Sequence, residues 1–234
     1  MGSSRVLYGV VLAVAFSVSL AEAETIFSTQ GDFIHDDDMQ FFTFSVSRMS
    51  DVHIYTLSYA GSSAAPGGTN AAGQVIVPDG FAPVLSLFSG STGQLLTYSA
   101  PAAVPGTNTC AYCAVDRDTG APWDADIQIK LAPGTYTLVL TEDDNLPMGG
   151  YLSDGFMQQG NGDFTGPYFN QGQPDSFWDA HPDPRTSHWA VDALMAPEPG
   201  AFWLCGIGML AALLLRRVPA RAGVRPGSRR STAL

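Results

Sequence analysis

The chain has 234 residues and carries 22 acidic against 11 basic side chains, a formal net charge of −11 at neutral pH. Seven of the 11 basic residues lie outside residues 24–196, so this central segment holds 20 acidic and 4 basic side chains and a net charge of about −16. Such a segment repels nucleic acid and anionic lipid, which argues against nucleic-acid binding. Its length is enough for one domain with its own core.

The first residues have the composition of a secretory signal peptide. Arg5 supplies a short basic region, and an apolar run over residues 6–20 follows it. Ala21 and Ala23 flank Glu22 in the small-x-small pattern that signal peptidase cleaves. The sequence therefore predicts a signal peptide over residues 1–23 and cleavage after Ala23. A retained membrane anchor is the alternative, because the apolar run is slightly long.

A second apolar segment lies near the other end of the chain. Residues 201–215 carry no charge, and as a helix they span roughly 22 Å, less than the ~30 Å of a bilayer interior. Arg216 and Arg217 follow, and basic residues of this kind lie on the cytoplasmic side. We expect a short transmembrane helix in the inner membrane, followed by a basic cytoplasmic tail over residues 218–234.

The triplet Pro197, Glu198 and Pro199, the apolar segment and the pair Arg216 and Arg217 together resemble the PEP-CTERM sorting signal of Gram-negative bacteria. The resemblance covers residues 197–217. It implies processing by an exosortase-like enzyme, followed by a location at the cell surface or in an extracellular matrix of exopolysaccharide or biofilm. The chain departs from the family in one respect, since it continues to Leu234 where relatives end soon after the arginines.

Between these segments the sequence alternates between apolar and polar residues in short runs separated by turn residues, a pattern typical of antiparallel strands. In residues 40–46, for example, Phe42, Phe44 and Val46 share one face. The sequence contains no long helical period outside its two ends. We therefore expect one all-β domain over residues 24–196, an antiparallel β-sandwich. The predicted strands are residues 40–46, 52–58, 83–88, 94–98, 126–131, 135–141 and 189–194.

Several of these segments resemble the bacterial pre-peptidase C-terminal domain. The similarity is greatest to a subfamily of exported PEP-CTERM proteins named for a Desulfovibrio member. The resemblance implies a jelly-roll-like β-sandwich with an accessory or binding role and no catalysis. The segments that carry it are residues 36–44, 84–88, 93–96, 131–138, 141–145, 152–156 and 188–192.

Cys110 and Cys113 form a C-x-x-C motif in a long insertion. Haem attachment needs a histidine after the second cysteine, where the chain has Ala114, and a zinc site needs further ligands at suitable spacing. We expect a local disulfide, as suits an exported protein. A redox-active pair is the alternative.

Two acidic clusters are the main candidates for a site. Asp36, Asp37 and Asp38 precede a predicted strand. Glu142, Asp143, Asp144 and Asn145 follow another, and Asp143 and Asp144 are the ligands expected from this second cluster. If these strand ends meet, several carboxylate oxygens converge, as calcium requires. Calcium is therefore the one cofactor that the sequence suggests. The alternative is a solvated acidic loop that keeps the domain soluble. Residues 116–126 resemble an EF-hand loop only in part.

The sequence has no G-x-S-x-G, H-E-x-x-H or phosphate-binding loop motif. We therefore expect a non-catalytic exported protein of the cell surface or matrix. A calcium- or carbohydrate-binding accessory module is the alternative, because Trp123, Trp178 and Trp189 could stack on sugar rings. A hydrolase with a triad assembled by the fold is a weaker third hypothesis.

Overall fold

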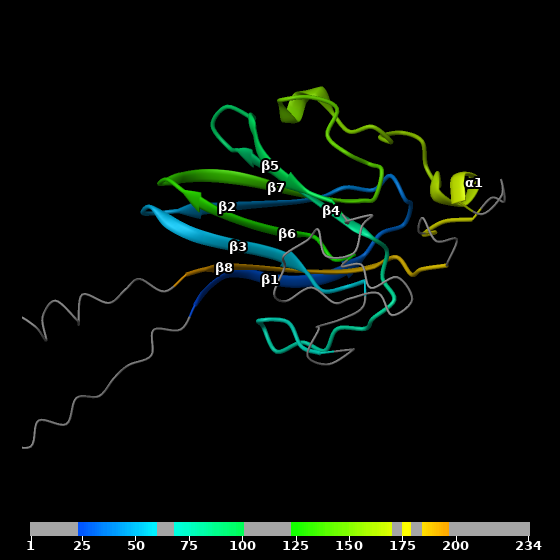
Figure 1. Ribbon diagram of the computed structural model, residues 1–234, viewed down its shortest axis with the longest axis horizontal. Helices are drawn as coiled ribbons and strands as arrows, with labels where there is room; N and C mark the ends of the chain where they lie inside the picture. Colours follow the sequence, from blue (N-terminus) through cyan, green and yellow to red (C-terminus); the bar gives the residue numbers. More distant parts are fainter. Residues whose placement is uncertain (1–22, 60–67, 101–122, 170–174, 179–183, 197–234) are drawn as a thin grey trace, which may run out of the picture. The chain divides into compact units, whose positions relative to one another are not determined.

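The computed structural model describes residues 23–59, 68–100, 123–169, 175–178 and 184–196 (Figure 1). Eight strands and two short helices make up its regular structure. The strands are β1 (Glu24–Asp32), β2 (Gln40–Val46), β3 (Ser50–Thr56), β4 (Pro83–Ser89), β5 (Leu95–Ser99), β6 (Asp126–Leu131), β7 (Gly134–Glu142) and β8 (His188–Met195). The helices are the 3₁₀ turn η1 (Leu152–Asp154) and α1 (Thr165–Phe169).

The strands form two four-stranded antiparallel sheets. One sheet has the order β1-β8-β3-β6, and the other has the order β2-β7-β4-β5. The first strand pairs with the eighth, the second with the seventh, the third with the sixth and the fourth with the fifth. This nested pairing is the winding of an eight-stranded jelly roll. The all-β class and the antiparallel sandwich expected from the sequence are confirmed.

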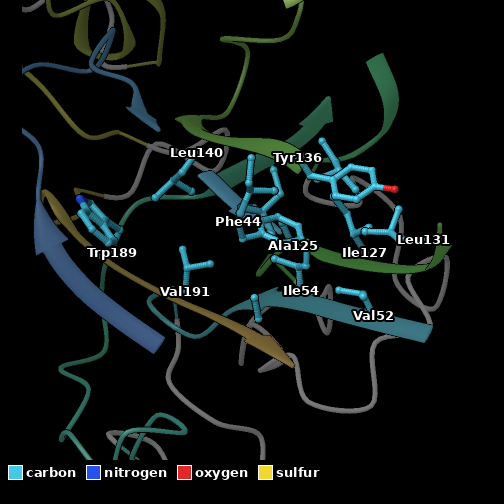
Figure 2. Packing of buried hydrophobic residues seen from close by; sticks show 14 of the residues in the cluster. Phe44, Val52, Ile54, Ala125, Ile127, Leu131, Tyr136, Leu140, Trp189 and Val191 are labelled. Carbon is cyan, nitrogen blue, oxygen red and sulfur yellow. The ribbon is translucent and has the colours of Figure 1, made fainter. Parts of the chain in front are cut away.

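The main core lies between the two sheets, because alternate residues of each strand point inward (Figure 2). Phe44 and Val46 of β2 are buried there, as their shared face predicts, and Phe42 packs against the same cluster. Trp189 of β8 lies edge-on to Phe42, with ring centroids 5.8 Å apart. A Cβ at Gly31 of β1 would stand 2.5 Å from the Trp189 ring, so a glycine is required beside this indole.

Segments outside the sheets cover part of each outer face. Phe156 packs on Phe88 and Val139 of the β2-β7-β4-β5 sheet. Ile76 packs on Tyr55 and Ala190 of the other sheet. Both covering residues are buried, which explains why their strands are apolar on two faces rather than one.

The seven predicted strands are all present, with ends that shift by at most two residues. The sequence prediction missed β1, whose Gly31 and irregular register between Thr25 and Phe27 obscure the alternation. Within the described part of the chain, no helix is long and apolar enough to cross a membrane. The predicted transmembrane helix, the signal peptide before Ala23 and the basic tail lie outside the described residues.

Candidate functional site

The two acidic clusters meet at one end of the sandwich. Because Gln40 of β2 pairs with Leu140 of β7, the loop before β2 lies beside the loop after β7. The amide of Asn145 donates a hydrogen bond to the carbonyl oxygen of Asp37, at 3.5 Å. The structure thus brings together the strand ends on which the calcium hypothesis depends. We call this region, with the loops that reach it, the acidic end.

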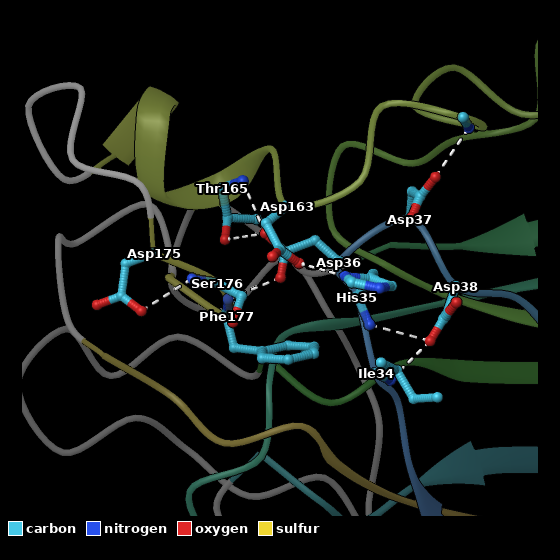
Figure 3. Close-up of polar contacts among 11 residues, drawn as sticks. Ile34, His35, Asp36, Asp37, Asp38, Asp163, Thr165, Asp175, Ser176 and Phe177 are labelled. Carbon is cyan, nitrogen blue, oxygen red and sulfur yellow. Dashed lines mark hydrogen bonds and ion pairs between the residues drawn. The ribbon is translucent and has the colours of Figure 1, made fainter.

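Asp36 is the centre of the acidic end, and its side chain is fully buried. One carboxylate oxygen accepts hydrogen bonds from the backbone N–H of Thr165, at 2.8 Å, and from the Thr165 hydroxyl (Figure 3). The other oxygen accepts the backbone N–H of Phe177, at 2.7 Å. Asp36 therefore holds the loop before β2 against two segments that lie about 130 to 140 residues further along the chain.

Glu142, the last residue of β7, is buried beside Asp36 with only 2% of its surface exposed. Burial raises its pKa well above the usual range, and the neighbouring charge of Asp36 and a hydrogen bond to that carboxyl raise it further. Burial also raises the pKa of Asp36, but the hydrogen bonds from Thr165 and Phe177 oppose this shift. Glu142 is therefore the member of the pair that gives up its proton less readily.

One oxygen of this buried pair lacks a partner. Oε2 of Glu142 is shielded from solvent and accepts no hydrogen bond. Most buried polar atoms are hydrogen-bonded, and an unpaired one costs about 1–3 kcal/mol. This atom is therefore the point at the acidic end where an additional ligand would gain most.

The other predicted calcium ligands bond to the backbone of nearby loops. Asp37 Oδ2 accepts the backbone N–H of Gly160, at 2.8 Å. Asp38 Oδ2 accepts the N–H groups of Ile34, at 2.6 Å, and His35. These contacts give both side chains a structural role, since each satisfies donors that no strand pairs.

Asp143 and Asp144 form the turn that follows β7. Oδ1 of Asp143 accepts the backbone N–H of Asp144, at 3.0 Å. Asp144 has a φ of 65°, a left-handed conformation that aspartate tolerates in tight turns. Both side chains are half-buried.

Among the residues that the structure describes, no group of three or more His, Cys, Asp or Glu is arranged to hold a metal ion. The five predicted ligands thus lie at one end of the fold without forming a ready cation cage. Glu142 belongs to the second acidic cluster that the sequence predicts, whereas Thr165 and Phe177 were not predicted as parts of the site. Glu142 adjoins a predicted strand, but its burial depends on long-range packing that the local pattern does not reveal.

A histidine lies at the edge of the same region. Nδ1 of His35 stands 3.1 Å from Oδ1 of Asp163, and both side chains are about half exposed. The hydrogen bond to Asp163 and its charge raise the pKa of His35. A second histidine, His53 of β3, lies 2.7 Å from Asp126 of β6, far from Asp36 along the strands.

The tryptophans considered for sugar stacking are largely enclosed. Trp123 and Trp189 are buried, and Trp189 belongs to the main core. Trp178 is half-buried, with its backbone N–H bonded to the Thr165 hydroxyl. Trp123 and Trp189 are therefore not available for stacking on a sugar ring in this structure.

Other predicted positions fall elsewhere. Ala23 is exposed and directly precedes β1. The remaining predicted positions lie outside the described residues: Ala21, Cys110, Cys113, Pro197, Glu198, Pro199, Arg216 and Arg217.

No protein-family model matches the chain, and no curated protein matches it. Among solved structures, the chain is similar to the pre-peptidase C-terminal domain of a collagenase from Bacillus anthracis, with 17% sequence identity and a TM-score of 0.28. The similarity covers 51% of this chain and 79% of that one. The PEP-CTERM signal and the subfamily named for a Desulfovibrio member remain expectations from the sequence.

Proposed function

We propose that the chain is a non-catalytic exported protein of the cell surface or extracellular matrix, sorted by a PEP-CTERM and exosortase-type system. The main support for this proposal is that the folded domain occupies the residues between the predicted signal peptide and the predicted sorting signal. Strand β1 begins at Glu24, directly after the predicted cleavage at Ala23, and β8 ends at Met195, two residues before Pro197. The sandwich thus accounts for nearly all of the chain that would remain after both predicted segments are cleaved off.

The partners follow from this proposal. Signal peptidase and an exosortase-like enzyme would process the chain, and the inner membrane of a Gram-negative bacterium would hold it in between. Exopolysaccharide is the surrounding material in which the mature domain would reside. Nucleic acid is not a partner, because the domain is strongly acidic.

The geometry of the acidic end supports a non-catalytic role. General acid–base catalysis needs a titratable group within hydrogen-bond reach of a substrate. Asp36 and Glu142, the pair with raised pKa values, are buried. Asp37 and Asp38 bond to loop backbone instead. These carboxyls stabilise the fold and offer no open reaction site.

Fractionation and mass measurement test the proposal. An epitope inserted between Ser91 and Thr92, both exposed in the β4–β5 turn, would follow the protein through the host. We expect it in the membrane and extracellular fractions, with a mature mass that lacks residues 1–23 and the C-terminal segment. Changing Pro197, Glu198 and Pro199 to alanine should leave the tagged protein in the membrane fraction. A protein that stays in the cytoplasm would overturn the proposal.

A calcium-binding role is the second candidate, favoured by the unpartnered Oε2 of Glu142 beside Asp36. Carboxylate oxygens are the ligands that calcium prefers, although it needs six to eight of them. Asp36 and Glu142 would supply the carboxylate oxygens, and Glu142 would release its proton as calcium binds.

Calorimetry with calcium tests this second candidate. The wild-type protein should release or absorb heat on titration, and Glu142→Gln should abolish the signal. Glu24→Gln is the matched control, because Glu24 is exposed at the other end of the sandwich. Silence in the wild type, together with an unchanged melting temperature, would remove calcium from consideration.

A further inference from the structure

The first and last strands end side by side, at the end of the sandwich opposite to the acidic end. Glu24 of β1 pairs with Met195 of β8, and Met195 also pairs with Val52 of β3. Beyond the strand, the backbone N–H of Ala196 donates to the carbonyl oxygen of Asp51, at 2.8 Å. Backbone pairing thus continues to Ala196, the residue before the predicted sorting segment.

We call this region the tail end. It contains the turns between β2 and β3, between β4 and β5 and between β6 and β7, because these strands start or finish beside Glu24 and Met195 in the two sheets (Figure 1). It consists of Glu24 and residues 47–51, 90–93, 130–134 and 195–196.

Charge is distributed unequally between the two ends. At the tail end, Glu24 lies 3.9 Å from Arg48, and Asp51 lies 3.1 Å from Lys130. Asp154 adds one acidic side chain there, because the segment around it is hydrogen-bonded to Gly93 and Leu95. At the acidic end, Arg185 is the one Lys or Arg side chain among the described residues. The acidic side chains there are Asp32, Asp36, Asp37, Asp38, Asp79, Asp124, Glu142, Asp143, Asp144, Asp163 and Asp175, whereas Asp126 and Asp192 lie beside Tyr55, midway along the sheet.

This separation of charge orients the domain at an anionic surface. Acidic lipids repel the acidic end more strongly than the tail end, where three acidic side chains face two basic ones. This repulsion is felt within a Debye length of about 8 Å at physiological ionic strength. The tail end also exposes an apolar side chain, since Met49 in the β2–β3 turn is 59% exposed beside Arg48. The methylene chain of Arg48 and the Met49 side chain can both contact apolar lipid, while the guanidinium stays among the headgroups.

We propose that the tail end lies against the lipid surface while the C-terminal segment remains in the membrane, and that the acidic end points away from the bilayer. This inference rests on the proposed membrane attachment. The backbone bond of Ala196 keeps the chain at the tail end up to the predicted sorting segment, and the charge distribution sets the orientation.

Lipid quenching of site-specific fluorophores tests the orientation. The full chain would be reconstituted in phosphatidylglycerol and phosphatidylethanolamine vesicles that carry headgroup nitroxides. A fluorophore would be attached through Met49→Cys at the tail end or Ile34→Cys at the acidic end, where Ile34 is 79% exposed. The background would replace the three native cysteines by serine, at Cys110, Cys113 and Cys205.

We expect quenching of the Met49 label to exceed that of the Ile34 label several-fold. Equal quenching of the two labels in vesicle-bound protein would overturn the orientation and leave the proposed attachment intact. A full chain that fails to float with the vesicles would overturn both.

A second variant tests the part played by charge without disturbing the core. Arg48→Glu combined with Lys130→Glu changes two exposed side chains and makes the tail end more acidic. Quenching of the Met49 label should fall at least twofold in the anionic vesicles and remain unchanged in phosphatidylcholine vesicles. An unchanged signal in the anionic vesicles would contradict the electrostatic part of the inference.

Discussion

The two ends of the sandwich differ in how they satisfy the backbone. At the tail end, turns of two to five residues join the strands, and pairing between strands occupies most N–H and C=O groups. At the acidic end the connections are long, and carboxylates such as Asp36 and Asp38 accept the loop N–H groups instead. The chain therefore relies on several acidic side chains as structural acceptors at the acidic end, whereas at the tail end strand pairing predominates and Asp154 accepts the N–H of Tyr151.

The largest effect should come from Asp36→Ala, which removes the acceptor of three buried donors from Thr165 and Phe177. Each buried donor left unpaired costs about 1–3 kcal/mol, so we expect the free energy of unfolding to fall by roughly 4 kcal/mol. Urea denaturation of the purified protein measures this. Asp38→Ala is the control and should cost about 1 kcal/mol, since its partners are exposed. Equal losses would contradict the central role of Asp36.

Substitution of Gly80 or Gly90 by alanine compares how tightly the backbone is packed at the acidic end and at the tail end. A Cβ at Gly80 would stand 2.2 Å from the carbonyl oxygen of His188, whereas one at Gly90 would stand 2.7 Å from that of Thr135. The backbone at His188 or Thr135 would have to move to relieve the clash, and overpacking of this kind lowers the free energy of unfolding by about 1–3 kcal/mol. We expect Gly80→Ala to lower the melting temperature more than Gly90→Ala does. Scanning calorimetry would show the reverse order if the tail end were the less adaptable of the two.

Glu142→Gln tests the buried proton at the acidic end. Because the pKa of Glu142 is raised in the folded state, the unfolded chain loses this proton first as the pH increases. The stability contributed by the group is therefore present below the ordinary glutamate pKa and is lost as the pH rises toward the folded-state value.

The variant lacks this titration, so its stability relative to the wild type should increase with pH through that window. Urea midpoints measured between pH 4 and pH 9 without divalent cations check it. Parallel curves for the two proteins would show that Glu142 is ionised when folded. Added calcium should narrow the gap if calcium occupies the site.

The smallest effect is expected from Lys130→Gln. The ion pair of Lys130 with Asp51 joins two largely exposed side chains, and such pairs contribute about 0–1 kcal/mol. The urea midpoint should change little, and it should respond equally little to added salt. A large loss of stability would mean that charge pairing, and not strand pairing, holds the tail end together.

The sequence predicts the strands well because alternation is a local property. The alternation within residues 40–46 alone predicts that Phe44 and Val46 share a face, and both side chains are buried in the structure. Strand β1 escaped prediction because an irregularity at its start and Gly31 near its end interrupt that pattern. Pairing with β8 and the indole of Trp189 stabilise it, and both are distant in sequence.

The candidate site was predicted only in its location. The sequence places Asp36 and Asp143 at strand ends, and the pairing of β2 with β7 brings those ends together. The local pattern does not show that Asp36 binds Thr165 and Phe177, because these contacts depend on the path of the long connection before β8. The net charge of the domain likewise conceals its unequal distribution along the strands.

The pairing of Glu24 with Met195 has a mechanical consequence. A force that draws these two residues apart would break the β1–β8 ladder one residue pair at a time. The reason is that Glu24 and Met195 form the first pair of the ladder, so the force acts across the strands at that pair. A pull on Met195 from the far end of the sandwich would instead shear β8 along both β1 and β3 and load many pairs at once. The domain should therefore resist tension between Met195 and the far end of the sandwich better than tension between Glu24 and Met195.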